Sequence, residues 1–534
     1  MKFNKFLFGA AALSMGVFAS CSSDEPVKGP EGGNINKDGS NYIAVRISTA
    51  GLNSSRAIAD GGYQEGSEAE NSVTKENTRF YFFDASGNAF SMKDAVNVNG
   101  TVANKVTNMV APTDIAPGNT NGNTSATLNG VLILGTAANS YQGVVPSQAV
   151  CVVNLTTAQF EALENKSFTE LAEITNNMSA DVFVQDAFVM SSSNYDGAPT
   201  LGATDIISKV YATATDAESN PADFWIERLA VKVQFEKNQE TSFDVLDTDG
   251  ITPLSLDVYQ LDGSKVPTTF KVTLDGWQLV NRADKAYIFK NLPTGLDWDW
   301  SNAQYHRSFW AVNPTNVAFE TASTTFDILA ETKWGAIENA QYTYEYTDNA
   351  TTVTKASERG KDVTGLAIRA TICDNNGKPF QLVRFAGVSY TRAAFEDMVI
   401  RAYLGNNSES KVEDFVVVYE QEEGKNTYAA SIKKANPAEG DANTPVAMDR
   451  YVKIQLWDGG KTAYYLNIQH FTGTTGPTLY GVVRNHIYEY GVEDVIGLGI
   501  PGNEDPNPEE TETYVAARLN VLNWKVVSNK VTLE

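Results

Sequence analysis

The chain ends in a strand-like run that an acidic segment separates from the rest of the sequence. Residues 499–512 hold three prolines and five acidic side chains, and too few apolar ones to form a core of their own. Residues 514–527 then alternate apolar and polar positions, as a β-strand does. Because a lone strand is not stable in water, this run must add to a sheet of its own chain or of a neighbour. The sequence therefore predicts a flexible linker and a donor strand within 499–534.

The alternation within this run changes phase once, after Val521. Such a change is what a β-bulge produces, because one extra residue turns the following side chains to the other face. The apolar residues expected to insert into a sheet are Val515, Ala517, Leu519, Val521, Leu522, Trp524 and Val526.

The other end of the chain predicts export. Basic residues precede an apolar run at 6–19, which is too short to span a bilayer but fits a secretory signal. Small residues then lead to Cys21, in a pattern that resembles a bacterial lipobox with acylation of the cysteine thiol. The alternative is an ordinary signal peptide with an incidental cysteine. We predict a lipoprotein signal peptide at 1–20, with the lipid as the membrane anchor.

Length and composition indicate a β-rich exported protein. The 534 residues carry a net charge of −24, which argues against nucleic-acid binding because that needs basic patches. Short runs rich in Val, Ile, Thr, Tyr and Phe recur between Gly, Asn and Asp. We predict two β-sandwich domains in series, at 57–240 and 241–498. Cys151 and Cys373 are expected to be buried free thiols, with a disulfide as the alternative.

Apolar runs give the expected elements. A strand is expected at 42–48, where Ile43, Val45 and Ile47 share one face. One helix is expected over 157–175. Further strands are expected at 79–83, 130–134, 149–153, 187–190, 224–235, 270–274, 286–289, 366–372, 415–419, 451–457, 463–468 and 486–490.

The loop after the first expected strand is small, polar and rich in glycine, which is the kind of loop that proteases enter. It spans 51–62, and Arg56 is the sole basic residue between Arg46 and Lys75. An Arg-specific protease could therefore cut this loop at a single position.

Patterns of catalysis and metal binding are scarce. The three histidines, His306, His470 and His486, have no cysteine or second histidine at ligand spacing. The turn 247–250 resembles part of a calcium loop, but Val245 stands where that loop would begin with Asp. We therefore predict no enzyme activity and no cofactor.

The aromatic cluster at 296–310 has two interpretations. Its rings, with Trp298, Trp300 and Trp310 among them, could stack on the apolar faces of a glycan. They could also close one end of a sandwich, and we favour this second interpretation because large aromatic side chains are normally buried.

Several short motifs, none specific alone, occur in a characteristic order. They are the start through Cys21, the strand before 55–57, and the runs 188–191, 226–232, 276–281, 307–311, 483–488 and 521–526. Together they resemble the fimbrillins of Bacteroidales type V pili, most closely the minor-fimbrillin branch. The resemblance spans nearly the whole chain, although residues 320–450 match weakly.

The resemblance implies an all-β fold of two tandem transthyretin-like β-sandwich domains with few short helices, plus a C-terminal donor strand. It implies export as an outer-membrane lipoprotein and cleavage between Arg56 and Ala57 by an Arg-specific protease. Cleavage would remove the lipidated propeptide 21–56, and with it the strand that carries Ile43, Val45 and Ile47.

The resemblance further implies polymerisation by donor-strand exchange. Each subunit would donate the run from Tyr514 to a neighbour, as in a shaft subunit of an extracellular fimbrium that supports adhesion. The implied partners are identical neighbouring subunits and accessory tip and anchor fimbrial proteins. The alternative is a monomeric surface lipoprotein that binds glycans or host proteins.

Overall fold

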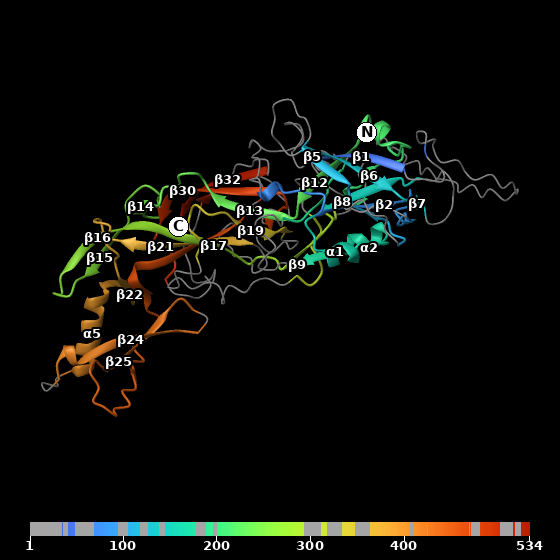
Figure 1. Ribbon diagram of the computed structural model, residues 1–534. Helices are drawn as coiled ribbons and strands as arrows, with labels where there is room; N and C mark the ends of the chain where they lie inside the picture. The colour runs from blue at the N-terminus through green and yellow to red at the C-terminus, as the bar shows by residue number, and fades with distance from the viewer. Residues whose placement is uncertain are drawn as a thin grey trace, which may run out of the picture.

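The computed structural model is all-β, as the sequence predicts, with a few short helices (Figure 1). It describes residues 35, 41–48, 69–93, 105–117, 127–137, 145–177, 188–195, 200–292, 311–317, 334–347, 364–405, 410–423, 425–468, 470, 481–501, 516–517 and 525–533.

One mixed sheet is built from the N-terminal part of the chain (Figure 1). Its inner face packs on a core that includes Phe80, Phe224 and Ile226. The strands, in spatial order, are β4 (Met109–Val110), β2 (Thr78–Phe83), β8 (Gln148–Val153), β10 (Met190–Ser192), β12 (Ala222–Arg228), β1 (Asn41–Ser48), β6 (Thr127–Leu134) and β5 (Asp114–Pro117), with β11 (Thr204–Asp205) beside β8.

A second mixed sheet is built from later residues and packs on a core around Trp277. Its strands, in order, are β19 (Gln341–Tyr344), β13 (Ala230–Phe235), β30 (His486–Ile496), β14 (Ser242–Leu246), β17 (Lys271–Val280), β21 (Gly365–Cys373) and β28 (Lys461–Asn467). Near the C-terminus, β32 (Lys525–Leu533) pairs in parallel with β30, and β31 (Ala516–Ala517) pairs with β32.

A third unit projects beside the second sheet, where Figure 1 shows α5, β24 and β25 in orange. It has its own core around Phe395, which lies on helix α5 (Arg392–Leu404). A three-stranded sheet belongs to this unit, with β24 (Phe415–Gln421), β25 (Tyr428–Lys434) and β26 (Val446–Ala447). A five-stranded sheet contributes residues both to this core and to the core around Trp277, and its strands are β16 (Lys265–Thr269), β15 (Ser255–Tyr259), β23 (Val388–Thr391), β22 (Leu382–Phe385) and β27 (Gln455–Trp457).

Short elements complete the described chain. Three two-stranded pairs are β18 (Lys285–Tyr287) with β9 (Thr175–Asn177), β20 (Tyr346–Thr347) with β29 (Gly481–Val482), and β3 (Met92–Lys93) with β7 (Thr136–Ala137). The remaining helices are α1 (Thr157–Ala162), α2 (Phe168–Ala172), α3 (Ala214–Glu218), η1 (Ala69–Asn71), η2 (Thr200–Gly202), η6 (Val412–Asp414) and η7 (Asp458–Gly460).

The single strand expected at 224–235 is two strands in different sheets. The chain leaves the first sheet at Arg228 and enters the second at Ala230, so the sheets change well before the predicted domain boundary at 240/241. Between them, Leu229 is fully buried and its N–H donates to the Val189 carbonyl at 2.9 Å. The sequence has apolar residues before and after Leu229, and its periodicity does not indicate that the two halves of the run pair in different sheets.

The helix expected over 157–175 is two helices, α1 and α2. Each begins with its own capping box, Thr156 with Gln159 and Ser167 with Glu170. Between them Asn165 has a positive φ of 55°, which a helix does not allow, so the chain turns there.

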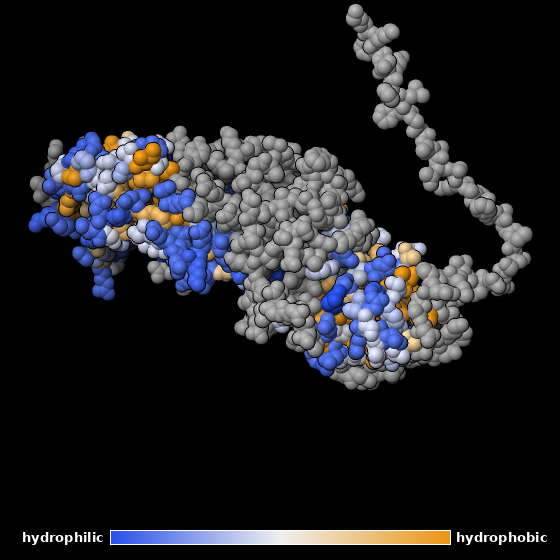
Figure 2. All heavy atoms as spheres, turned by 90° about the horizontal axis from the view of Figure 1, so that it is seen from above, coloured by the Kyte–Doolittle hydropathy of each residue, from blue (hydrophilic) through white to orange (hydrophobic). Residues whose placement is uncertain are grey.

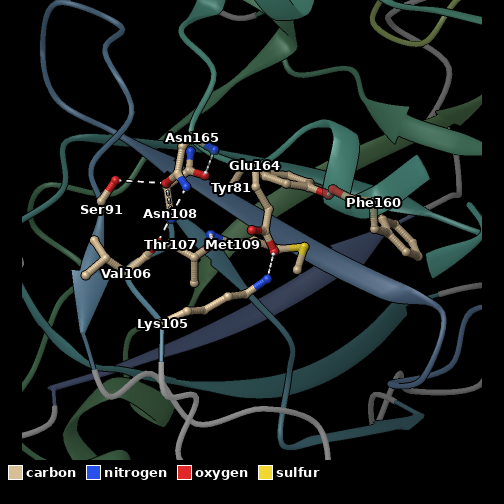
Figure 3. A network of polar contacts seen from close by, with 10 residues as sticks. All are labelled: Tyr81, Ser91, Lys105, Val106, Thr107, Asn108, Met109, Phe160, Glu164 and Asn165. Carbon is tan, nitrogen blue, oxygen red and sulfur yellow. Dashed lines mark hydrogen bonds and ion pairs between the residues drawn. The ribbon is translucent and has the colours of Figure 1, made fainter. Parts of the chain in front are cut away.

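Asn165 also anchors the helices to the sheet (Figure 3). Its backbone N–H donates to Oδ1 of Asn108 at 2.7 Å, and the Asn108 Nδ2 donates to the Phe82 carbonyl on β2 at 3.1 Å. The Ser91 hydroxyl donates to the Asn165 side chain at 2.9 Å. Nearby, the buried Tyr81 hydroxyl donates to the Phe160 carbonyl at 2.8 Å, which holds α1 against β2.

Buried charges join the two large sheets. Arg484 is fully buried and pairs with Glu345, and its guanidinium donates to the Tyr287 and Ile288 carbonyls at 2.6 and 3.0 Å. Arg228, at the end of β12, donates to the Glu70 carbonyl at 2.7 Å and to Oδ1 of Asn485, directly before β30, at 3.0 Å. Burial lowers the pKa of Arg228 to about 10, so the guanidinium stays charged at neutral pH. Such buried charges fix how the two sheets meet, because each charge would lose its hydrogen-bond and ion-pair partners if the sheets separated.

On the face seen in Figure 2, the described residues are largely hydrophilic, with apolar residues in smaller groups between them. Within the part of the chain that the structure describes, every helix is too short or too polar to cross a membrane.

The Asn108 network predicts a stability effect. Asn108→Ala leaves the buried Phe82 carbonyl and Asn165 N–H without these partners, and should lower the free energy of unfolding by about 1–3 kcal/mol. Ser91→Ala removes a more exposed hydrogen bond of the same network and should cost only about 0.5–1 kcal/mol. Urea unfolding measures both variants, and equal effects would contradict the anchoring role of Asn108.

Candidate functional site

The first strand lies inside its sheet. Along the chain, the stretch that carries the expected protease loop connects it to the strands that follow. β1 pairs along its full length with β6 in the antiparallel sense, from Asn41 opposite Leu134 to Ser48 opposite Thr127. On its other edge β1 pairs in parallel with β12 over 45–48 (Figure 1). Both edges of β1 are therefore hydrogen-bonded, as the core strand of a sheet requires.

The inner face of β1 fills the centre of the N-terminal core. Ile43 and Ile47 have no exposed surface and Val45 has 1%, so the predicted inward face is confirmed. They pack among residues of β6 and β12 such as Leu132 and Phe224. Burying each aliphatic side chain is worth about 1.5–3 kcal/mol, which makes β1 a large part of what stabilises this core.

The outer face of β1 carries a bidentate ion pair. Arg46 Nη2 donates to Asp223 Oδ2 at 2.7 Å, and Arg46 Nε donates to the other carboxylate oxygen. The hydrogen bond to Asp223 raises the pKa of Arg46. Because both side chains are about half exposed, the pair contributes more to geometry than to stability.

Glycine is required where β6 faces β1. Gly130 lies opposite Val45, and a Cβ at this position would be 2.7 Å from the Asp114 carbonyl oxygen and 3.3 Å from a Val45 methyl. A side chain at position 130 would therefore clash with the backbone of β5 and press on Val45 of β1.

If β1 were removed, the two strands that flank it would each keep a paired strand on the far edge. β6 pairs with β5 on its far edge, and β12 pairs with β10 on its far edge. Removal of β1 would leave an apolar trough between two strands, each with one unpaired edge. Such an edge is a template for any other strand of suitable pattern.

The residues that precede the C-terminal tail are held by the second sheet. Ile500 forms a pair of backbone hydrogen bonds with Ala463 on β28, at 2.8 and 3.0 Å, and Trp457 Nε1 donates to the Leu498 carbonyl at 3.2 Å. Beyond Pro501 the structure describes only β31 and β32. The strand expected at 514–527 therefore differs from what is observed, because β32 begins at Lys525 and runs to Leu533.

The other predicted site residues fall as follows. Ala517 lies in β31 and Val526 in β32. Outside the described residues lie Cys21, Arg56, Ala57, the aromatic cluster 296–310 with His306, and the expected donor residues Val515, Leu519, Val521, Leu522 and Trp524.

The two described histidines form a buried aromatic cluster. His470 Nδ1 lies 2.7 Å from the Tyr488 hydroxyl, and the His470 and His486 rings are 5.0 Å apart. Among the residues that the structure describes, no three His, Cys, Asp or Glu side chains are arranged to hold a metal ion. Cys151 and Cys373 are buried free thiols, which confirms that prediction, and burial raises the pKa of both.

Comparison with known families identifies the C-terminal region. Residues 455–530 match the family described as major fimbrial subunit protein type IV, fimbrillin, C-terminal. The match runs from β27 into β32. This match confirms the resemblance to fimbrillins for residues 455–530. No curated protein is a significant match to the sequence.

Three solved structures share distant similarity with the chain. A protein from Parabacteroides distasonis described as a cell adhesion protein is 11% identical, with a TM-score of 0.37, over 93% of this chain and 99% of that one. The tip fimbrial protein Mfa3 from Porphyromonas gingivalis, with a C-terminal truncation, is 9% identical over 65% and 83%, with a TM-score of 0.27. A fimbrial assembly protein from P. distasonis is 10% identical over 76% and 98%, with a TM-score of 0.28.

Some features of the site were not predicted from the sequence. The pattern indicates which side of β1 is buried, but it does not indicate that β1 is an interior strand or that Asp223 is its ionic partner. The one available signal is that Arg46 and Asp223 are opposite charges, the first within an expected strand and the second directly before one.

The burial of β1 predicts unequal effects of mutations within it. Ile47→Ala should lower the free energy of unfolding of the uncleaved protein by about 2–5 kcal/mol, because it leaves a cavity in the core. Arg46→Ala, on the outer face of the same strand, should cost no more than about 1 kcal/mol. Denaturant unfolding of both variants measures the difference, and a larger loss for Arg46→Ala would contradict the interior position of β1.

Proposed function

We propose that the protein is a structural subunit of a cell-surface fimbrium, and that subunits join by strand exchange at the β1 groove. The observation that carries this proposal is the position of β1, whose inward face is buried and which is paired with β6 along its length and with β12 over 45–48. The fimbrillin C-terminal match supports a role as a fimbrial subunit.

The proposed cycle begins with export as a lipoprotein acylated at Cys21 and placed in the outer membrane. While β1 stays in its sheet, the edges of β6 and β12 are covered and the subunit stays monomeric. An Arg-specific protease then cuts between Arg56 and Ala57, which releases β1 from its covalent connection to the rest of the chain. The lipidated segment 21–56 leaves, and an open groove remains.

A neighbouring subunit then fills the groove. The tail beyond Pro501 supplies apolar side chains at alternate positions and backbone groups that complete the ladders of β6 and β12. Burial of several aliphatic side chains at about 1.5–3 kcal/mol each gives a long-lived joint. Accessory tip and anchor proteins would cap the two ends. This role is structural and needs no catalytic residue. We further propose that the subunit consists of the two predicted domains, 57–240 and 241–498.

A second candidate function is a monomeric surface lipoprotein, in which the tail stays on its own sheet. The pairing of β32 with β30 within one chain favours this alternative. The two candidates differ in assembly state, which electrophoresis of the natural protein without boiling reads directly. A ladder of bands supports the fimbrium subunit, and a single band supports the monomer.

Cleavage at Arg56 is testable by substitution. Arg56→Ala should give a lipidated monomer that accumulates at the cell surface and forms no ladder, because β1 cannot leave. Arg56→Lys is the matched control, since it keeps the charge and blocks only a protease that requires arginine. Normal ladders from Arg56→Ala would disprove the processing step.

Deletion of 514–534 separates the two fates of the tail. If the tail acts on a neighbour, the truncated protein should keep a near-normal melting temperature and fail to extend fibres. If the tail completes only its own sheet, the deletion should lower the melting temperature by about 2–4 °C for each kcal/mol lost. Circular dichroism melts and the unboiled ladder, measured on the same preparation, distinguish the two outcomes.

A further inference from the structure

The tail contains a near copy of the strand that it is proposed to replace. β1 reads Tyr-Ile-Ala-Val-Arg-Ile-Ser over 42–48, and the tail reads Tyr-Val-Ala-Ala-Arg-Leu-Asn over 514–520. Aligned without a gap, the tyrosine, one alanine and the arginine are identical, and each inward apolar position remains apolar. The two segments lie at opposite ends of the chain, so this likeness is not part of a continuous repeat.

We infer that residues 514–520 enter a neighbour's groove in the register and direction of β1, with Arg518 taking the place of Arg46 on Asp223. This inference rests on the proposed function and specifies its joint. The occupant is the tail of a second copy of this chain, and the acceptor residues are those that hold β1 in the structure.

The inner face of the groove agrees with this register. Val515, Ala517 and Leu519 would take the places of Ile43, Val45 and Ile47, which are all buried. The copy loses one carbon at the first position, two at the second and none at the third. The smallest side chain would therefore lie opposite Gly130.

The outer face supplies what fixes the register. Asp223 is the register partner of Arg46 across the parallel pair of β1 and β12, and accepts both hydrogen bonds of the guanidinium. A slip of one residue would turn Arg518 into the apolar core, where an unpaired charge is costly. A slip of two residues would keep the faces correct but would place alanine or asparagine opposite Asp223.

The backbone at the start of the strand agrees as well. Tyr42 exchanges two hydrogen bonds with Tyr211, at 2.8 and 3.0 Å, and both use only main-chain atoms. Tyr514 would form the same pair in the neighbour. In the described part of the tail, Ala516 and Ala517 pair with β32 over two residues, so entry into the groove replaces this short pairing by a longer one.

Engineered cysteines read the register without altering Arg518. Ala516 would take the place of Ala44, which is opposite Val131 on β6. Oxidised fibres of Ala516→Cys with Val131→Cys should give dimers and longer ladders that survive boiling in detergent and collapse on reduction. The native Cys151 and Cys373 are buried and should remain silent.

Two matched pairs report slips of two residues in either direction. Asn129 and Ile133 lie on the same face of β6 as Val131, two residues to each side. Ala516→Cys combined with Asn129→Cys or with Ile133→Cys should stay uncrosslinked. Crosslinking in either of these pairs, or in none of the three, in fibres that assemble normally would overturn the register but leave the proposed function intact.

A disulfide within one subunit would mean that the tail fills its own groove, which would overturn both proposals. If the protein without engineered cysteines forms no fibres, the proposed function is refuted, and the register with it. The two failures are therefore distinguishable on one gel.

A charge exchange tests the role of the ion pair. Asp223→Lys should lower the ladder yield severalfold, and Arg518→Glu should do the same. The double variant should recover most of the yield, because the pair is restored with its charges reversed. Arg518→Lys keeps the charge but loses the two-pronged hydrogen bond, so its yield should be intermediate. Equal loss in the single and double variants would contradict the pairing.

Discussion

Backbone hydrogen bonding on both edges of β1 is the interaction on which the N-terminal sheet depends. Among the strands that the structure describes, β6 and β12 do not pair with each other, and β1 connects them across the centre of the sheet. Buried peptide groups need partners, so any state without β1 must either expose both edges to water or find another strand. Any strand that replaces β1 must also bring apolar side chains to the places of Ile43, Val45 and Ile47, because these places lie in the core. The proposed assembly follows from these two requirements together.

The rest of the molecule keeps this groove in shape. Arg228 fixes the end of β12 through Glu70, and Arg484 ties the second sheet to residues beside the first. Asn108 and Asn165 hold the helices against β2 on the other side. All of these groups follow Arg56 in the chain, so cleavage there would leave them in the mature subunit. A groove with rigid walls loses little entropy when a strand enters, which favours a stable joint.

Local sequence pattern predicted the elements better than it predicted their partners. The positions of β1, β2, β8, β21 and β28 follow from short apolar runs, and the buried face of β1 follows from alternation within its run. The interior place of β1 depends on residues at 127–134 and 222–225, and local periodicity does not carry such distant pairing. The break at Leu229 was missed for the same reason. Helix α5 was missed because its buried residues, among them Phe395 and Val399, form a narrow stripe in a segment with little family resemblance.

Hydrogen exchange at the amides of β6 and β12 that face β1 tests the central claim most directly. It should be followed by mass spectrometry in the uncleaved protein, in the cleaved subunit kept monomeric by dilution, and in fibres. The account predicts slow exchange in the uncleaved protein, fast exchange after cleavage, and slow exchange again in fibres, while β2 and β8 stay protected throughout. Slow exchange at β6 and β12 in all three states would show that the groove never opens, and would contradict the account.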